Sequence, residues 1–178
     1  MQHYKMGGMS SNKNLSFWSA LMIILIAISL QVAVYFHWIE VSFFVGSLRF
    51  GHWLGVLGTS FIAFLTPAYY VLKRRYPKRV KAMVNVHMFG NLFSFLLISM
   101  HFAQQVSRPP QFYPDLGTGV ILYAVMLILV STGFLHRFGL FERARVYPPH
   151  RNRFLHISIT LTFYLVILFH ALRNFGLI

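Results

Sequence analysis

The chain has 178 residues, of which 57% are hydrophobic and only 11% are charged. Soluble domains carry about a quarter charged residues, so this composition excludes an ordinary soluble domain. The net charge of +13 does not indicate nucleic-acid binding, because the basic residues stand in short runs beside long apolar segments, where topology signals and phospholipid contacts occur. The absence of cysteine excludes disulfides, iron–sulfur clusters and covalently attached haem.

The apolar residues form five segments, each close to the 20 or so residues that a helix needs to cross a bilayer. A polar tail at residues 1–16 comes first. We then expect spans at residues 17–39, 52–72, 82–106, 118–135 and 154–173. Pro67 is expected to bend the second span. The turns between spans are marked by Tyr76-Pro77, Arg108-Pro109-Pro110, Pro114-Asp115 and Pro148-Pro149. The sequence therefore predicts an all-α bundle of five transmembrane helices, forming one domain over residues 17–178.

The basic residues predict the orientation of this bundle. Thirteen of the sixteen fall on one side of the predicted membrane, namely Lys5, Lys13, Lys73, Arg74, Arg75, Lys78, Arg79, Lys81, Arg137, Arg143, Arg145, Arg151 and Arg153. The other side has Arg49, Arg108 and Arg173. Because basic residues concentrate on the cytoplasmic side, the N-terminus is expected inside and the C-terminus outside, in the plasma (cytoplasmic) membrane. No charged residue falls at mid-membrane, which argues against a carboxylate-based proton pump or an ion-coupled transporter.

Four of the nine histidines form a regular pattern. His87 and His101 lie fourteen residues apart in the third predicted span, and His156 and His170 lie fourteen apart in the fifth. Fourteen residues is close to four helical turns, so each pair lies on one helix face, with roughly 21 Å between its members along the axis. The two spans run in the same direction. We therefore expect His87 at the depth of His156, and His101 at the depth of His170.

This arrangement suits two stacked haems with two histidine ligands each. Every iron needs two axial ligands from opposite sides, so two facing helices must each supply one at the same depth. We expect two b-type haems, bound non-covalently, whose iron ligands are His87, His101, His156 and His170.

Haem propionates are anionic and need cations near each membrane surface. The candidates are Arg49, Arg108 and Arg173 outside, and Arg153 or Lys81 inside. Gly90 and Gly119 are expected to leave room for the macrocycle. The alternative is that the histidines are structural, since a single histidine in a membrane helix often makes a helix–helix hydrogen bond. Two pairs with equal spacing and matched depth favour haem ligation.

At these residues the chain resembles the ferric reductase-like transmembrane family, which includes the membrane parts of NADPH oxidases and ferric reductases. In that family, two histidines on one helix and two on a later parallel helix ligate two stacked haems. The segment LRFGHWLGVLGT, residues 48–59, also resembles the start of the family's preceding helix. The resemblance covers residues 45–175 and implies a diheme cytochrome b core there. Many members continue into a sixth helix and a flavin and NADPH domain, whereas this chain has no G-x-G-x-x-G fingerprint.

We therefore expect an electron-transfer subunit rather than a complete enzyme. Its electrons would pass across the membrane to or from a quinol or a separate redox protein. Membrane lipid and other membrane subunits are further possible partners. A quinol-oxidising cytochrome b subunit fits the same histidine spacing, although its proline-glutamate signature is not found. Cytochrome b561 proteins fit less well, because their ligand pairs are spread over four helices. A haem-free structural subunit also stays open.

Overall fold

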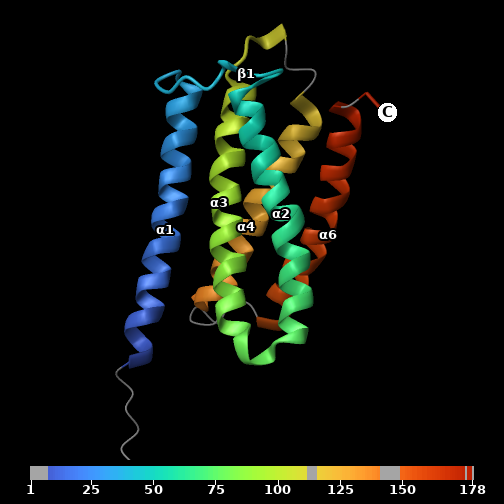
Figure 1. Ribbon diagram of the computed structural model, residues 1–178. Helices are drawn as coiled ribbons and strands as arrows, with labels where there is room; N and C mark the ends of the chain where they lie inside the picture. The colour runs from blue at the N-terminus through green and yellow to red at the C-terminus, as the bar shows by residue number, and fades with distance from the viewer. Residues whose placement is uncertain (1–7, 112–115, 141–148, 175, 178) are drawn as a thin grey trace, which may run out of the picture.

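The computed structural model describes residues 8–111, 116–140, 149–174 and 176–177. Its five long helices are α1 (Gly8–Tyr35), α2 (Phe50–Arg75), α3 (Val80–Val106), α4 (Gly117–Phe138) and α6 (Pro149–Asn174). Each contains a segment long and apolar enough to cross a membrane, and the helices lie side by side (Figure 1). The five predicted spans are confirmed, and the chain is a multi-pass integral membrane protein.

The first helix differs from its prediction at both ends. It begins at Gly8 instead of Phe17, so the polar stretch before the apolar segment is partly helical. It ends at Tyr35 instead of Ile39, because His37 adopts a left-handed conformation with φ of 59° and breaks the helix. The amides of Trp38 and Ile39 both turn back to the carbonyl oxygen of Ala33, at 2.8 and 3.2 Å. The expected end of the first span is therefore wrong.

A small antiparallel hairpin, which the sequence analysis did not predict, connects α1 to α2. It consists of β1 (Phe44–Val45) and β2 (Leu48–Arg49), with Gly46 in the left-handed region at φ 63° between them. The indole Nε1 of Trp53 donates a hydrogen bond of 2.9 Å to the Val45 carbonyl oxygen and ties the hairpin to α2. The hairpin marks one end of the bundle, which we call the hairpin end.

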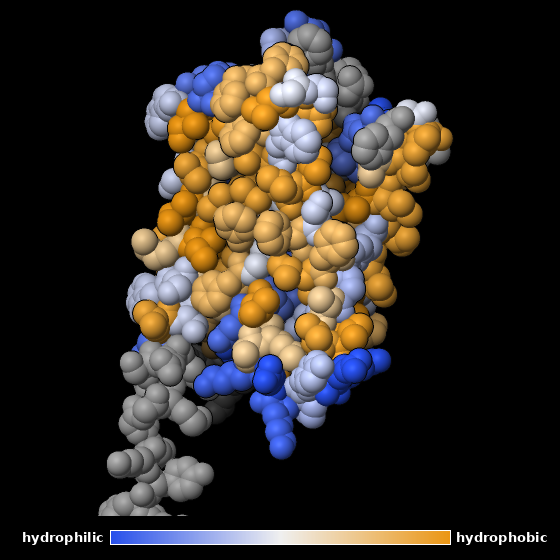
Figure 2. Space-filling model, in the orientation of Figure 1, coloured by the Kyte–Doolittle hydropathy of each residue, from blue (hydrophilic) through white to orange (hydrophobic). Residues whose placement is uncertain are grey.

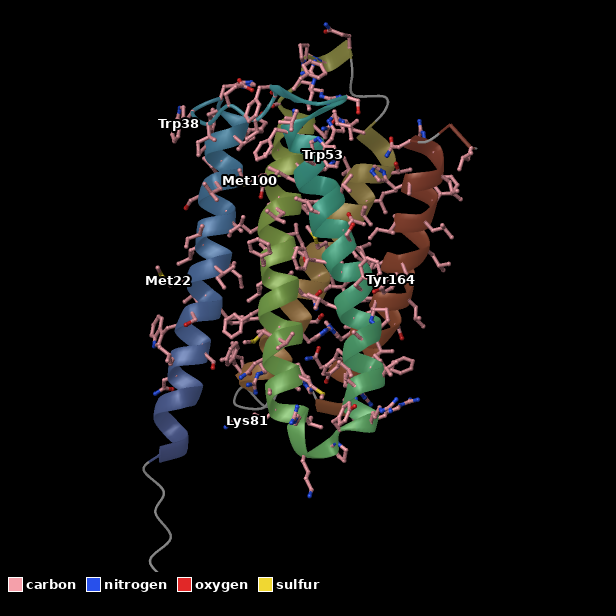
Figure 3. All side chains as sticks on the ribbon, viewed as in Figure 1. Met22, Trp38, Trp53, Lys81, Met100 and Tyr164 are labelled. Carbon is pink, nitrogen blue, oxygen red and sulfur yellow. The ribbon has the colours of Figure 1, made fainter. Side chains whose placement is uncertain are left out.

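The opposite end carries the connection between α2 and α3. The helix α2 continues past Pro67 to Arg75, and the predicted turn at Tyr76-Pro77 leads into the short 3-10 helix η1 (Pro77–Arg79). We call this the turn end. Figure 3 shows Lys81 near it, whereas Trp38 and Trp53 lie at the hairpin end. Lys5, Pro114, Asp115, Arg143, Arg145 and Pro148 lie outside the described residues. Which end faces the cytoplasm stays a prediction.

The helices pack as two pairs with α1 outside them. The α2–α3 pair and the α4–α6 pair each pack along their length, and α1 packs on α3. The two pairs meet through α3 and α4, and around Phe95 and Phe163, which are 2% and 1% exposed. The Tyr164 hydroxyl also donates a 2.9 Å hydrogen bond to the Ile62 carbonyl oxygen, from α6 to α2. On the face that Figure 2 shows, apolar residues cover the middle of the bundle and hydrophilic residues gather towards both ends.

Candidate functional site

The structure places the four predicted histidines at two levels of the bundle. Both α3 and α6 run from the turn end to the hairpin end (Figure 1). His156 lies close enough to His87 to act on it electrostatically, and His170 acts in the same way on His101. We call His101 with His170 the hairpin-side layer, and His87 with His156 the turn-side layer. Phe95 and Phe163, near the midpoints of the two histidine spacings, fill the core between the layers.

His101 is held by the backbone of α2. Its Nδ1 lies 2.9 Å from the Gly51 carbonyl oxygen, and because a carbonyl can only accept, Nδ1 carries the hydrogen. The other ring nitrogen, Nε2, is then left with its lone pair. Gly55 allows this close approach, since a Cβ at that position would lie 2.9 Å from the imidazole Cγ. His101 is therefore in the tautomer that a metal ligand needs at Nε2.

The two histidines of α6 are held by α4. Thr132 Oγ1 lies 3.0 Å from His156 Nδ1, and Thr118 Oγ1 lies 2.9 Å from His170 Nδ1. A glycine follows each threonine and faces the same ring. A Cβ on Gly133 would lie 3.2 Å from His156 Cε1, and one on Gly119 would lie 3.6 Å from His170 Cε1. Each imidazole therefore contacts a threonine hydroxyl of α4 and lies over the adjacent glycine, where no side chain separates the ring from the helix backbone.

His87 is held differently from the other three. Its ring stacks on that of Tyr69, with 4.5 Å between centroids and 22° between planes. The Asn91 amide nitrogen, which can only donate, lies 3.0 Å from Nδ1 and 3.4 Å from Nε2. The shorter of these two contacts makes Nδ1 the acceptor, which places the ring hydrogen on Nε2. Ligation through Nε2 would require His87 to change tautomer and leave the Asn91 amide.

Four buried polar atoms have no hydrogen-bond partner among the described residues, and all lie near the histidine layers. His52 Nδ1 and Gln104 Nε2 are at the hairpin-side layer, where the His52 and His101 ring centroids are 5.6 Å apart. Arg137 Nε and Asn152 Oδ1 lie between the turn-side layer and the turn end. Buried polar groups normally have partners, so these atoms indicate groups that the protein atoms alone do not satisfy.

The predicted hairpin-end cations reach this part of the molecule. Arg108 and Arg49 act electrostatically on His52, and Arg173 acts on His170. The Arg49 guanidinium also lies 5.4 Å from the centre of the Phe44 ring.

At the turn end, the predicted cation Arg153 is exposed, and no contact of its guanidinium is found in the described part of the chain. Lys81 is exposed too. Sequence reasoning did not select Arg137 for this role, although its Nη2 donates a 2.9 Å hydrogen bond to Asn85 Oδ1 and links α4 to α3. Arg137 lies five residues beyond Thr132 on α4. This spacing indicates a place near the turn-side layer only when the contact between Thr132 and His156 is already known.

The predicted role of glycine is only partly supported. Gly119 faces a histidine, as described above. Gly90 instead faces the Leu65 side chain, which a Cβ there would strike, so it allows α2 and α3 to pack closely. Sequence reasoning missed Gly55 and Gly133, which face histidines. The spacing contained a signal for one of them, because Gly119 and Gly133 are fourteen residues apart, like the histidines.

In comparisons with protein-family models, curated proteins and solved structures, no significant match was found. The resemblance to the ferric reductase-like family therefore stays a prediction. Among the described residues, no three or more histidine or acidic side chains group closely enough to hold a metal ion by themselves. A haem iron takes only two ligands from the protein, so the histidine pairs are the unit on which function can be argued.

Proposed function

We propose that this chain is a transmembrane diheme cytochrome b that passes electrons across the membrane between two haems, each with two histidine ligands. His101 and His170 would ligate one haem, and His87 and His156 the other. The observation that carries the proposal is the double repeat. Two histidines fourteen residues apart on α6 meet two Thr-Gly pairs fourteen residues apart on α4. Helix packing alone does not require a threonine hydroxyl and an adjacent glycine to face a histidine ring at both levels.

The chemistry of the donor set fits haem. His101 donates from Nδ1 to a carbonyl oxygen, and the α6 histidines lie against threonine hydroxyls at Nδ1, which leaves the Nε2 lone pairs of these rings for iron. At His170 the Asn174 amide, which donates to Nε2, would have to move away first. Metal-ligating histidines in general donate their other ring N–H in this way. A chain without cysteine can bind haem only non-covalently, as haem b is bound.

The polar groups near each layer fit the anionic haem propionates. At the hairpin side, Gln104 Nε2 and His52 Nδ1 are buried without hydrogen-bond partners among the described residues, and Arg108 acts electrostatically on both His52 and His101. On the turn side, Arg137 Nε is buried and has no hydrogen-bond partner within the part of the chain that the structure describes. A hydrogen bond to a charged carboxylate is charge-assisted and is stronger than a hydrogen bond between two neutral groups. Arg49 and Arg173 would add positive charge at the hairpin end, and Arg153 at the turn end.

When bound, each haem iron would supply a one-electron redox couple. The chain's own residues hold the ligands at two depths and exclude water between them with Phe95 and Phe163. The two ligand positions on one helix are roughly 21 Å apart, and the hydrocarbon layer is about 30 Å thick. Two haems would therefore replace one long electron transfer across this layer with shorter ones.

The electron donor or acceptor would be a quinol or a separate redox protein, which makes the chain an oxidoreductase subunit rather than a complete enzyme. The N-terminus would lie inside and the C-terminus outside the plasma membrane, because the basic residues gather at the turn end. Membership of the ferric reductase-like family would agree with this function.

The test is to count haems in the purified protein. A dithionite-reduced minus oxidised spectrum with a pyridine haemochromogen assay should give two b-type haems per chain. His101→Ala and His170→Ala should each reduce the count to one. The control His150→Ala, at an exposed position, should keep both haems. A colourless protein, or a count that these ligand substitutions do not change, would contradict the proposal.

A haem-free structural role is the second candidate, and the contacts of His87 favour it. That ring already has a stacking partner in Tyr69 and a hydrogen-bond donor in Asn91, as a structural histidine does. If this role is correct, the protein is colourless, and His87→Ala destabilises the bundle about as much as Tyr69→Ala. Thermal unfolding in detergent measures this comparison.

A further inference from the structure

We propose that Thr118 and Thr132 of α4 are positioning residues that fix the ring nitrogen protons of His170 and His156, and thereby set the haem affinity and redox potential of the two layers separately. This inference rests on the proposed diheme function. It adds α4, which supplies no ligand, as the helix that orients the ligands of α6.

The first support is the register of two antiparallel helices. The dipeptide Thr-Gly occurs twice in α4, at residues 118–119 and 132–133. The later copy meets the earlier histidine of α6, and the earlier copy meets the later one, as antiparallel neighbours require. Equal spacing on both helices allows the same contact to form at both levels.

The second support is the direction of the hydrogen bond at the turn-side layer. Thr132 Oγ1 lies 2.8 Å from the Ile128 carbonyl oxygen, which can only accept, so the single hydroxyl hydrogen of Thr132 is donated there. Towards His156 the oxygen must therefore accept, and Nδ1 of that ring carries the hydrogen. The Asn152 side-chain amide donates a 3.2 Å hydrogen bond to the Thr132 carbonyl oxygen and links the same residue to α6 again.

The hairpin-side layer leads to the same result by another route. The Asn174 amide nitrogen donates a 2.9 Å hydrogen bond to His170 Nε2, so that nitrogen holds a lone pair. The hydrogen of a neutral ring must then lie on Nδ1 and point to Thr118 Oγ1, at 2.9 Å. In both layers the ring hydrogen lies on Nδ1 and points to a threonine oxygen, in the tautomer whose Nε2 can bind iron.

A hydrogen bond from Nδ1 makes the imidazole more basic and fixes its orientation. A more basic axial ligand stabilises the ferric iron relative to the ferrous one and lowers the potential. Valine has the shape of threonine without the acceptor. Thr118→Val should therefore raise the midpoint potential of one haem, and Thr132→Val that of the other. Loss of such an outer partner typically weakens metal affinity by about 10–100-fold, and each variant should show this in its own layer only.

The experiment uses the full-length protein in detergent, titrated with haem and then with reductant in a spectroelectrochemical cell. Thr118→Ser and Thr132→Ser keep the acceptor and should restore wild-type affinity and potential. Thr162→Val is the matched control, because the Thr162 hydroxyl donates only to the Ser158 carbonyl oxygen, on an exposed face of α6. It should change neither potential.

Potentials that shift together in both valine variants, or in neither, would overturn the inference while leaving the diheme function intact. Failure of the serine variants to restore them would have the same meaning. If the wild-type protein binds no haem, the proposed function fails, and nitrogen-15 NMR of the imidazoles still tests the hydrogen bonds. The Nδ1–H tautomer should dominate at His156 and His170, and at His156 it should be lost in Thr132→Val. A mixed tautomer in the wild-type protein would contradict the inference.

Discussion

The two histidine layers have the same ligand spacing but differ in how their rings are held. In the hairpin-side layer, both rings carry their hydrogen on Nδ1, which faces a backbone carbonyl oxygen at His101 and Thr118 at His170. The Asn174 amide donates to His170 Nε2 and would have to leave it before iron binds. In the turn-side layer, only His156 carries its ring hydrogen on Nδ1. His87 instead accepts a hydrogen bond at Nδ1 and stacks on Tyr69.

This difference indicates that equal spacing does not make two equal sites. A ligand that is already in the right tautomer and orientation loses little entropy on binding. A ligand that must first break contacts binds with a less favourable free energy, because those contacts are lost. His170 and His87 must each leave an asparagine amide, but only His87 must also change tautomer and leave a stacked ring. The hairpin-side layer should therefore bind haem more tightly, and the turn-side layer should be limited by the release of His87.

The largest expected effect comes from filling the space in which His101 sits. In Gly55→Val, the new side chain would push the imidazole away from the Gly51 carbonyl oxygen, because even a Cβ would lie 2.9 Å from His101 Cγ. Overpacking of this kind costs about 1–3 kcal/mol. We expect loss of the hairpin-side haem with the turn-side haem retained, so the haemochromogen count should fall from two to one. Gly117→Ala is the control, because a Cβ there meets nothing within 4 Å. Retention of both haems in Gly55→Val would mean that His101 needs no support from α2.

A smaller effect, of opposite sign, is expected at the turn-side layer. Asn91→Leu removes the donor that competes for the His87 ring, at Nδ1 and close to Nε2. Titration of the haem-free wild-type protein should show a tight and a weaker site, and in Asn91→Leu the weaker site should tighten towards the other. We expect a gain of a few-fold, since one such hydrogen bond contributes only about 1 kcal/mol.

Asn174→Leu tests the same reasoning on the other layer, because Asn174 also donates to a histidine four residues before it. Its removal should free His170 Nε2 for iron, while the bond to Thr118 keeps the ring hydrogen on Nδ1, so the tight site should tighten by about a few-fold as well. Two sites of equal affinity in the wild-type protein would remove the basis of the comparison.

Sequence periodicity was sufficient to predict the five spans and the regular histidine spacing. Apolar segments of membrane length have only one stable local structure, since every backbone polar group must be satisfied within the helix. The end of α1 could not be predicted in this way, because His37 in the left-handed region depends on how the chain turns back into the β1–β2 hairpin.

The partners of the histidines could not be predicted, because they depend on which neighbouring helix each ring faces. The Gly51 carbonyl oxygen is a backbone atom, so no residue type indicates its role with His101. Thr118 and Thr132 look like ordinary small polar residues of a membrane helix until α4 is known to pack on α6. Arg137 was grouped with the topology signals, and only the fold separates it from exposed cations such as Arg153.

The smallest expected effect concerns a polar chain that lies beside the hairpin-side layer without touching its histidines. The Tyr123 hydroxyl donates a 2.6 Å hydrogen bond to Gln31 Oε1 and lies 3.0 Å from Ser99 Oγ, which joins α1, α4 and α3. Because the Tyr123 hydroxyl donates its only hydrogen to Gln31, Ser99 must donate to the Tyr123 oxygen. The ring also stacks on Phe102, with 4.0 Å between centroids.

Tyr123→Phe keeps this stacking and removes only the hydroxyl. Interhelical hydrogen bonds in membranes contribute about 0.6 kcal/mol on average, and this substitution breaks two, so we expect a loss of about 1 kcal/mol in thermal or denaturant unfolding in detergent. Haem affinity and both potentials should stay at wild-type values, because the hydrogen bonds on His101 and His170 remain. A drop in hairpin-side haem affinity would instead mean that this layer is ordered by the rigidity of the whole bundle, and that the contacts of its histidines do not by themselves explain its difference from the turn-side layer.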